Sequence, residues 1–248
     1  MPTDTSHPCF QPPANPNTPI WRYMDFTKFV ALLDTQSLYF ARSDRFDDPY
    51  EGATSHANFD LREIVYQETI TPEMLTLMSR LTKWTREWTY VSCWHLNEHE
   101  SWAMWKLYGS LEGAIAIQST YSKLLECLKD NAHVNVGIVK YIDYESEWLP
   151  EGNLYWPFLH KRKYFEHEKE IRAIIQKMPV NEKNEIPIGK ANEKQGVIVP
   201  LNLSDFIEKI YVSPNSPQWF YELVESVIKR FNHSFSVVQS SLSKAPVY

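Results

Sequence analysis

Hydrophobic positions along the chain repeat with two different periods, and each change of period marks a boundary between elements. A two-residue period predicts a strand, and a spacing of three and four residues predicts a helix. The predicted strands are 20–24, 37–41, 91–95, 113–118, 134–142, 171–175, 196–201, 207–212 and 234–238. The predicted helices are 26–34, two within 54–87 that are separated at Thr71-Pro72, then 100–109, 120–129, 154–168 and 217–231.

The order of these elements indicates the fold class. Strands are interrupted by helices without a regular strand-helix-strand alternation, which favours an α+β fold over a doubly wound one. We expect one domain over residues 20–248, with a mixed or antiparallel sheet core and helices packed on it. The helices of 54–87 are expected to cover one side of that sheet, and the polar segment 177–196 to form a hairpin tip. Residues 1–19 are proline-rich and aperiodic, so they are predicted to be a disordered lead-in.

The stretch from Val91 to Gly109 concentrates aromatic and ionisable residues around one polar turn. Asn97, followed three residues later by Glu100, is typical of a helix N-cap with its capping box. Trp102, Trp105 and Tyr108 are expected to be mostly buried, because a short helix with so much aromatic area needs a core to hold it. Such a stretch either anchors the helix in the hydrophobic core, with its polar residues at the surface, or lines a ligand pocket.

Composition and charge narrow the class of protein. The chain has 248 residues, of which 43% are hydrophobic and 14% aromatic, so it can bury a sizeable core. A formal net charge of −6 argues against a protein that binds duplex nucleic acid by neutralising phosphates. The cysteines, Cys9, Cys93 and Cys127, are odd in number and widely spaced, as is typical of reduced thiols. No signal peptide or long apolar run is present, so we expect a soluble cytoplasmic protein with no membrane partner.

Several motifs resemble those of a mostly bacterial family catalogued as domain-of-unknown-function family 2971. They are the opening WRYM, the loop RFDDPYEG, the strand VSCW, the helix pattern ES..MW..YG and the segment K.FEHEKEIR, and together they span about Trp21 to Arg172. The family name carries no activity. The resemblance therefore implies a shared arrangement of these segments, and the chemistry has to be inferred from individual residues.

A second resemblance concerns the layout of Arg22, Ser92 and Glu170. A strand-borne arginine, a serine on a second strand and the Glu168-Lys169-Glu170 segment before a third resemble the arginine-serine-glutamate class of ADP-ribosyltransferases. That resemblance implies an ADP-ribosyltransferase-like fold that binds NAD. Arg22 would hold the NAD phosphates, Ser92 the nicotinamide side, and Glu170, with Glu168, the ribose and the oxocarbenium ion. The Ser-Thr-Ser signature of that class is absent, since VSCW has a single serine.

A purely structural role for the same residues is the competing hypothesis. Glu166, Glu168 and Glu170 alternate with basic residues, and mixed charge runs of this kind are usually solvated faces with weak ion pairs. In that case Arg22 would pair with Asp47 or Asp48.

Further residues are predicted to line a nucleotide site beside Arg22. The candidates are four aromatic side chains that could form its walls and one carboxylate for a ribose or base, namely Tyr23, Tyr39, Trp94, Trp105 and Asp48.

Metal chemistry offers two alternatives. His95-Leu-Asn-Glu-His99 spells the inverted zinc-protease string, but His95 closes a strand, so the two histidines would not share a helix face. Asp47, Asp48 and Glu51 with Glu168 could hold Mg²⁺ in a nuclease-like site, or they could stiffen a turn and pair with nearby arginines.

We expect no structural metal. Cys93, in mid-strand, is predicted to be a small buried hydrophobe rather than a nucleophile.

Three functions follow as hypotheses. The leading one is a bacterial NAD- or nucleotide-binding enzyme or effector of ADP-ribosyltransferase type, in a toxin or phage-defence context, with a protein or nucleic acid as its target. The second is a non-catalytic module that senses a nucleotide or peptide. The third is the metal-dependent nuclease.

Overall fold

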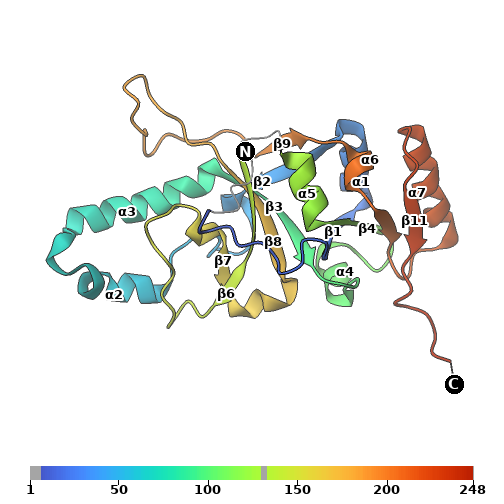
Figure 1. Ribbon diagram of the computed structural model, residues 1–248, viewed down its shortest axis with the longest axis horizontal. Coiled ribbons are helices and arrows are strands. Elements are labelled where there is room, and N and C mark those ends of the chain that lie inside the picture. The colour runs from blue at the N-terminus through green and yellow to red at the C-terminus, as the bar shows by residue number, and fades with distance from the viewer. Residues whose placement is uncertain (1–6, 130–132, 248) are drawn as a thin grey trace.

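The computed structural model describes residues 7–129 and 133–247, which form one large sheet with helices packed on it and two helices that extend away from it (Figure 1). The strands are β1 Pro19–Asp25, β2 Ser37–Arg42, β3 Thr89–Leu96, β4 Ala114–Thr120, β5 Val134–Ile138, β6 Lys140–Ile142, β7 His160–Arg162, β8 Glu170–Gln176, β9 Gly196–Pro200, β10 Lys209–Val212 and β11 Ser236–Gln239. The α-helices are α1 Phe26–Thr35, α2 His56–Tyr66, α3 Pro72–Thr85, α4 Trp102–Tyr108, α5 Tyr121–Leu128, α6 Leu203–Phe206 and α7 Gln218–Arg230. Short 3₁₀ turns are η1 Ser43–Arg45, η2 Gln67–Thr69, η3 Arg86–Trp88, η4 Trp156–Phe158 and η5 Lys163–Glu168.

The sheet is mixed, and the predicted α+β class is confirmed. Within the described residues, the hydrogen-bonded strand order runs β11-β10-β4-β1-β3-β2-β9, and β8 pairs with both β3 and β5. All of these pairings are antiparallel except β10 with β11. The parallel pair β6-β7 forms a separate small sheet.

The sheet has two differently covered faces. One carries the main core, in which Phe29 and Leu33 of α1 pack with strand residues such as Ile20 and Ile171, and we call it the α1 face. The other carries Trp21 and Tyr23 of β1, which pack with Trp105 of α4, and we call it the α4 face. Because side chains alternate along a strand, each strand residue can be assigned to one face by its neighbours.

Local sequence explains where the helices begin. The side chains of Asp25, Ser55, Thr71 and Thr120 each accept a hydrogen bond from a backbone N–H in the first turn of the helix that follows. Pro72 stands at the first position of α3, where its missing N–H has no helical partner to lose. The two helices predicted within 54–87 and their break are therefore confirmed.

The cap of α4 is not the predicted one. Ser101, rather than Asn97, is the N-cap residue and accepts from the backbone N–H of Met104 at 3.4 Å. Glu100 instead accepts from the indole Nε1 of Trp105 at 3.0 Å. The loop after β3 is thus longer than the capping-box pattern suggested.

Four other expectations are wrong. Residues 7–19, part of the predicted disordered lead-in 1–19, are anchored by buried Cys9 and Phe10, which pack with Val91 and Ile174; residues 1–6 lie outside the described residues. The predicted helix 154–168 is two 3₁₀ turns separated by β7. The segment 177–196 is no hairpin tip, because β9 pairs with β2 and not with β8. The helices α2 and α3 do not cover the sheet but extend away from it (Figure 1).

No helix within residues 7–129 and 133–247 is both long and apolar enough to cross a membrane.

Candidate functional site

The sheet is split beside the middle of β3. On the edge of β3 that faces away from β8, β1 pairs only at His95 and Leu96, while β2 pairs only at Tyr90 and Val91. The edge from Ser92 to Trp94 lies between these two short pairings. Such a split needs a side chain to satisfy the polar groups that the strands would otherwise pair.

Arg22 of β1 fills this split. Its Nη1 donates to the Ser92 hydroxyl at 3.0 Å, and its Nη2 donates to the Tyr39 carbonyl of β2 at 3.2 Å. The guanidinium also lies 5.5 Å from the ring centroid of Trp94. The structure therefore brings Arg22 and Ser92 together and does not pair Arg22 with Asp47 or Asp48.

Glu170 does not join them. Arg22 lies opposite Ile117 and Ser92 opposite Ala173, and both partners belong to the sheet on its α1 face. Glu170 precedes Ile171, which also points to the α1 face, so its own side chain projects on the α4 face. The prediction that Arg22, Ser92 and Glu170 converge in one cleft is wrong.

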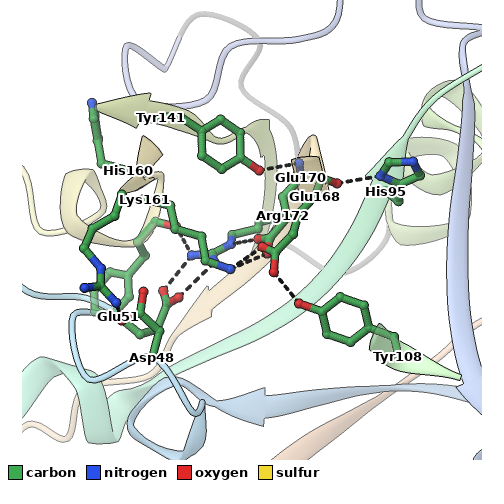
Figure 2. A network of polar contacts seen from close by, with 12 residues as sticks. Asp48, Glu51, His95, Tyr108, Tyr141, His160, Lys161, Glu168, Glu170 and Arg172 are labelled. Atoms are coloured by element: carbon green, nitrogen blue, oxygen red, sulfur yellow. Dashed lines mark hydrogen bonds and ion pairs between the residues drawn. The ribbon is translucent and has the colours of Figure 1, made fainter. Parts of the chain in front are cut away.

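Glu170 belongs instead to a buried cluster of charges on the α4 face (Figure 2). Arg172 donates two hydrogen bonds to the Glu51 carboxylate, at 2.6 and 2.9 Å, and its Nε donates to Glu170. Lys161 Nζ lies 2.9 Å from the second oxygen of Glu170. We call Glu51, Lys161, Glu168, Glu170 and Arg172 the charge cluster.

Glu168 forms the outer end of the charge cluster. One of its carboxylate oxygens accepts from the hydroxyl of Tyr108 on α4, and the other accepts from Lys161 (Figure 2). Glu168 itself is 3% exposed, whereas Tyr108 is 46% exposed. Tyr108 therefore stands between Glu168 and solvent.

The backbone between the two glutamates turns them toward the same lysine. Lys169, the residue between Glu168 and Glu170, has the left-handed φ of 41°, which a non-glycine residue rarely adopts. The backbone N–H of Glu170 donates to the Tyr141 hydroxyl at 2.8 Å. In a regular strand the two glutamates would lie on the same face, but their carboxylates would be farther from a single lysine. The left-handed turn at Lys169 therefore contributes to the contact that both carboxylates make with Lys161.

His95 contributes a buried acceptor beside the cluster. Its Nδ1 lies 2.6 Å from the carbonyl oxygen of Glu168, and because a carbonyl only accepts, that nitrogen carries the proton. Its Nε2 is therefore an acceptor, and it is buried without a hydrogen-bond partner in the described structure. Burial also lowers the pKa of His95, which keeps the ring neutral near pH 7.

The pKa values of Glu168 and Glu170 are shifted in opposite directions. Burial, together with the neighbouring Glu170 carboxylate, raises the pKa of Glu168 to about 7. Burial also acts to raise the pKa of Glu170, but Arg172 and Lys161 outweigh it and hold that pKa well below its usual range. Glu168 is therefore the group of this pair that exchanges a proton near neutral pH.

This difference predicts how stability depends on pH. The native pKa of Glu168, about 7, exceeds its ordinary value of 4.5, so the folded state binds more protons between these values and its free energy of unfolding falls as pH rises through that window. The fall should be about 1 to 3 kcal/mol, since one pKa unit corresponds to about 1.4 kcal/mol. Urea unfolding of the wild type and of Glu168→Gln at pH 5 and pH 7.5 measures it. A Glu168→Gln variant with the same pH dependence as the wild type would contradict this assignment.

The other predicted binding residues are divided between the two faces. Trp94 lies on the α1 face beside Arg22, while Tyr23 and Trp105 pack edge to face on the α4 face with ring centroids 4.9 Å apart. Tyr39 meets Arg22 through its carbonyl group, and Asp48 is held by Arg162 Nη2 at 2.7 Å. These residues do not form one aromatic pocket around Arg22.

The described residues contain no group of three or more His, Cys, Asp or Glu side chains that could hold a metal ion. Asp48, Glu51 and Glu168, which the nuclease hypothesis assigned to Mg²⁺, are each bonded to a cationic side chain instead. His95 lies in β3, as the sequence indicated, one residue before the end of the strand, and so cannot share a helix face with His99. Burial raises the pKa of Cys93, which opposes thiolate formation.

Two surface cavities lie apart from the charge cluster. One, of about 250 Å³, is lined by residues of α2 and α3, among them Arg62 and Leu75. The other, of about 480 Å³, lies beside the loop before α4 and includes Trp21, Glu100 and Tyr211. No residue of the charge cluster lines either cavity. Glu168, which is 3% exposed, is bonded to the hydroxyl of the exposed Tyr108.

The comparisons with known proteins add little to this geometry. No protein-family model and no curated protein matches the sequence, so the resemblance to family 2971 gains no support. Among solved structures, Thermus sp. 2.9 DarT in complex with NAD⁺ is similar at 11% identity and a TM-score of 0.38, over 93% of this chain and 98% of that chain. At this level of similarity, the function has to be argued from the side chains.

Proposed function

We propose that the protein is an NAD-cleaving enzyme of ADP-ribosyltransferase type, with its reacting centre at Glu168 on the α4 face. The observation that carries the proposal is a buried glutamate, with a pKa near neutrality, that lies directly beneath an exposed tyrosine. Strongly shifted carboxylates of this kind are concentrated at functional sites.

The charge of the cluster favours a ligand that is or becomes cationic. Three carboxylates face two cationic side chains, so one negative charge is in excess when all of them are ionised. In NAD the nicotinamide ring is cationic, and the ribose acquires oxocarbenium character as nicotinamide leaves with the electron pair of the broken C–N bond. A carboxylate opposite the ribose carbon would stabilise that transition state.

The residues of the charge cluster take different roles in this proposal. Glu168 faces the ribose and accepts the proton of the incoming nucleophile, as its pKa near 7 suits. Glu170 is fixed by Arg172 and Lys161 and acts as a positioning residue. The unpaired Nε2 of His95 is available to accept a hydrogen bond from a ribose hydroxyl.

The phosphates of NAD need another partner than Arg22, which lies on the opposite face. Lys169 is exposed and directly follows Glu168, and Lys106 is exposed on α4, two residues before Tyr108, with its Nζ 5.6 Å from the ring centroid of Trp102. We assign the phosphates to these lysines, because an ammonium group binds phosphate as a point charge.

Label transfer tests the proposal. Purified protein is incubated with NAD labelled in the adenylate moiety and with a cell lysate, and the label is followed into macromolecules and into free ADP-ribose. We expect label in at least one of these fractions with the wild type and a loss of about a hundredfold or more with Glu168→Gln. The matched control is Glu166→Gln, which changes an exposed glutamate two residues away and should keep its activity.

A sensing module is the second candidate. It is favoured by the complete pairing of the five charged side chains, which leaves Glu168 closed under Tyr108. In that case calorimetry would show NAD binding that depends on Lys106 and Lys169, with no labelled product.

A further inference from the structure

The larger of the two surface cavities, of about 480 Å³, has a floor made by the sheet. Trp21 of β1, Gln118 of β4, Tyr211 of β10 and Val238 of β11 line it, and these four strands are neighbours in the sheet. Gln118 lies opposite Trp21 in the register, and Val238 lies opposite Tyr211, so all four side chains project on the α4 face. A cavity of this volume can hold a small organic molecule.

Two segments outside the sheet complete the lining of this cavity. The loop before α4 contributes Glu98, His99 and Glu100. The chain after β11 contributes Leu242 and Lys244, among others. Because it includes this last segment, we call it the C-terminal cavity.

Several polar side chains of the C-terminal cavity have no partner within the described chain. The side-chain amide of Gln118, the hydroxyl of Tyr211 and the carboxylate of Glu98 form no hydrogen bond or ion pair with another described residue. Gln118 and Tyr211 are partly buried, so each has given up part of its contact with water without gaining a protein partner. These groups are therefore available to a ligand.

The carboxylates give the C-terminal cavity an excess of negative charge. Glu98 and Glu100 line it, and Lys244 is the one lysine or arginine among its described lining residues. Lys244 forms no ion pair with a described residue, and Glu100 is bonded to the neutral indole of Trp105. Burial, together with the Glu100 carboxylate, raises the pKa of Tyr211, so the charge of Glu100 also acts on the floor.

The floor adds an aromatic surface. The ring of Tyr211 is partly exposed and packs edge to face on the buried Trp21, with ring centroids 5.0 Å apart. A cation over the face of a tyrosine ring is attracted by the quadrupole of the ring. Carboxylates beside an aromatic floor therefore favour a ligand that carries a positive charge next to an apolar group.

We propose that the C-terminal cavity binds a small organic cation, whose ammonium or guanidinium group is held by the Glu98 and Glu100 carboxylates and whose apolar part packs on Tyr211. Gln118 and the Tyr211 hydroxyl supply further hydrogen bonds. This proposal does not depend on the enzymatic one, because no residue of the charge cluster lines the C-terminal cavity.

Isothermal titration calorimetry of the full chain with three probes tests the preference for positive charge. Benzylammonium, benzyl alcohol and benzoate share one aromatic ring and differ in charge. We expect benzylammonium to bind about tenfold more tightly than benzyl alcohol, and benzoate to bind most weakly. The proposal would be overturned by benzyl alcohol or benzoate binding as tightly as benzylammonium, or by benzylammonium giving no heat of binding at millimolar concentration.

Two substitutions locate the bound cation. Glu98→Gln removes a carboxylate and should weaken benzylammonium binding by about threefold or more, whereas Lys244→Ala removes a competing ammonium group and should strengthen it. Both residues are exposed, so both variants should keep the circular dichroism spectrum of the wild type. The matched control is Glu112→Gln, which changes an exposed glutamate outside the cavity and should leave binding unchanged. If Glu98→Gln and Lys244→Ala both bind benzylammonium as the wild type does, the cation binds elsewhere and the proposed site is wrong.

Discussion

Arg172→Ala is expected to destabilise the protein by about 3 to 5 kcal/mol, because it leaves Glu51 and Glu170 buried without their shared cation. The loss should exceed that of an ordinary salt bridge, since Arg172 is almost completely buried and donates to three different residues. Urea unfolding at pH 7.5 followed by circular dichroism measures the loss.

The control for this substitution is Lys163→Ala, which removes a charge pair from the surface. Lys163 bonds to Glu147 at 2.5 Å, and the two side chains remain 57% and 41% accessible to water, so we expect a much smaller loss than for Arg172→Ala. Equal losses in the two variants would show that the charge cluster is no more tightly coupled than a surface pair.

Trp105→Ala is expected to cost about 3 to 5 kcal/mol, through the cavity that it leaves between α4 and β1. Trp105 is 0% exposed, packs against Tyr23, and donates from its indole to Glu100. The matched control is Trp102→Ala on the same helix, where the side chain is 40% exposed and the expected loss is about 1 kcal/mol or less. Thermal unfolding at one pH distinguishes the two variants, and a melting temperature of Trp105→Ala close to that of the wild type would contradict the role of α4 as an anchored element.

This pair of tryptophans also shows the limit of the sequence prediction. The aromatic content of 102–108 correctly indicated a helix with a buried anchor, and Trp105 is that anchor. The same pattern does not reveal that Trp102 and Tyr108 remain exposed, because α4 has only seven residues and presents one narrow side to the sheet. The exposed Tyr108 is the residue that closes the charge cluster.

The faces of the sheet could not be predicted from local pattern either. Arg22 lies between Trp21 and Tyr23, and β1 is mostly buried on both sides, so hydrophobic alternation gives no orientation for the arginine. The relative orientation of Arg22 and Glu170 depends on the registers of β1 with β3 and of β3 with β8. These registers are set by contacts between residues far apart in the chain.

Lys161 was missed for a different reason. Its segment has the apolar spacing of a helix, but Pro157 lies in a 3₁₀ turn and residues 160–162 pair with β6 as a short parallel strand. The sequence did identify Glu168, Glu170 and the loop containing Glu51 as candidates for chemistry. It could not show that Lys161 and Arg172 join them, because that contact exists only in the folded sheet.

The release of nicotinamide from NAD tests the central claim most directly. Unlabelled NAD is incubated with the wild type, with Glu168→Gln and with Glu166→Gln, and free nicotinamide is quantified by proton NMR, without any acceptor or lysate. The site predicts release by the wild type and by Glu166→Gln, and a rate about a hundredfold or more lower with Glu168→Gln at unchanged fold. If nicotinamide is released equally fast by all three proteins, Glu168 is not part of the reacting centre. If NAD stays intact with all three proteins, the proposal that this protein is an NAD-cleaving enzyme is wrong.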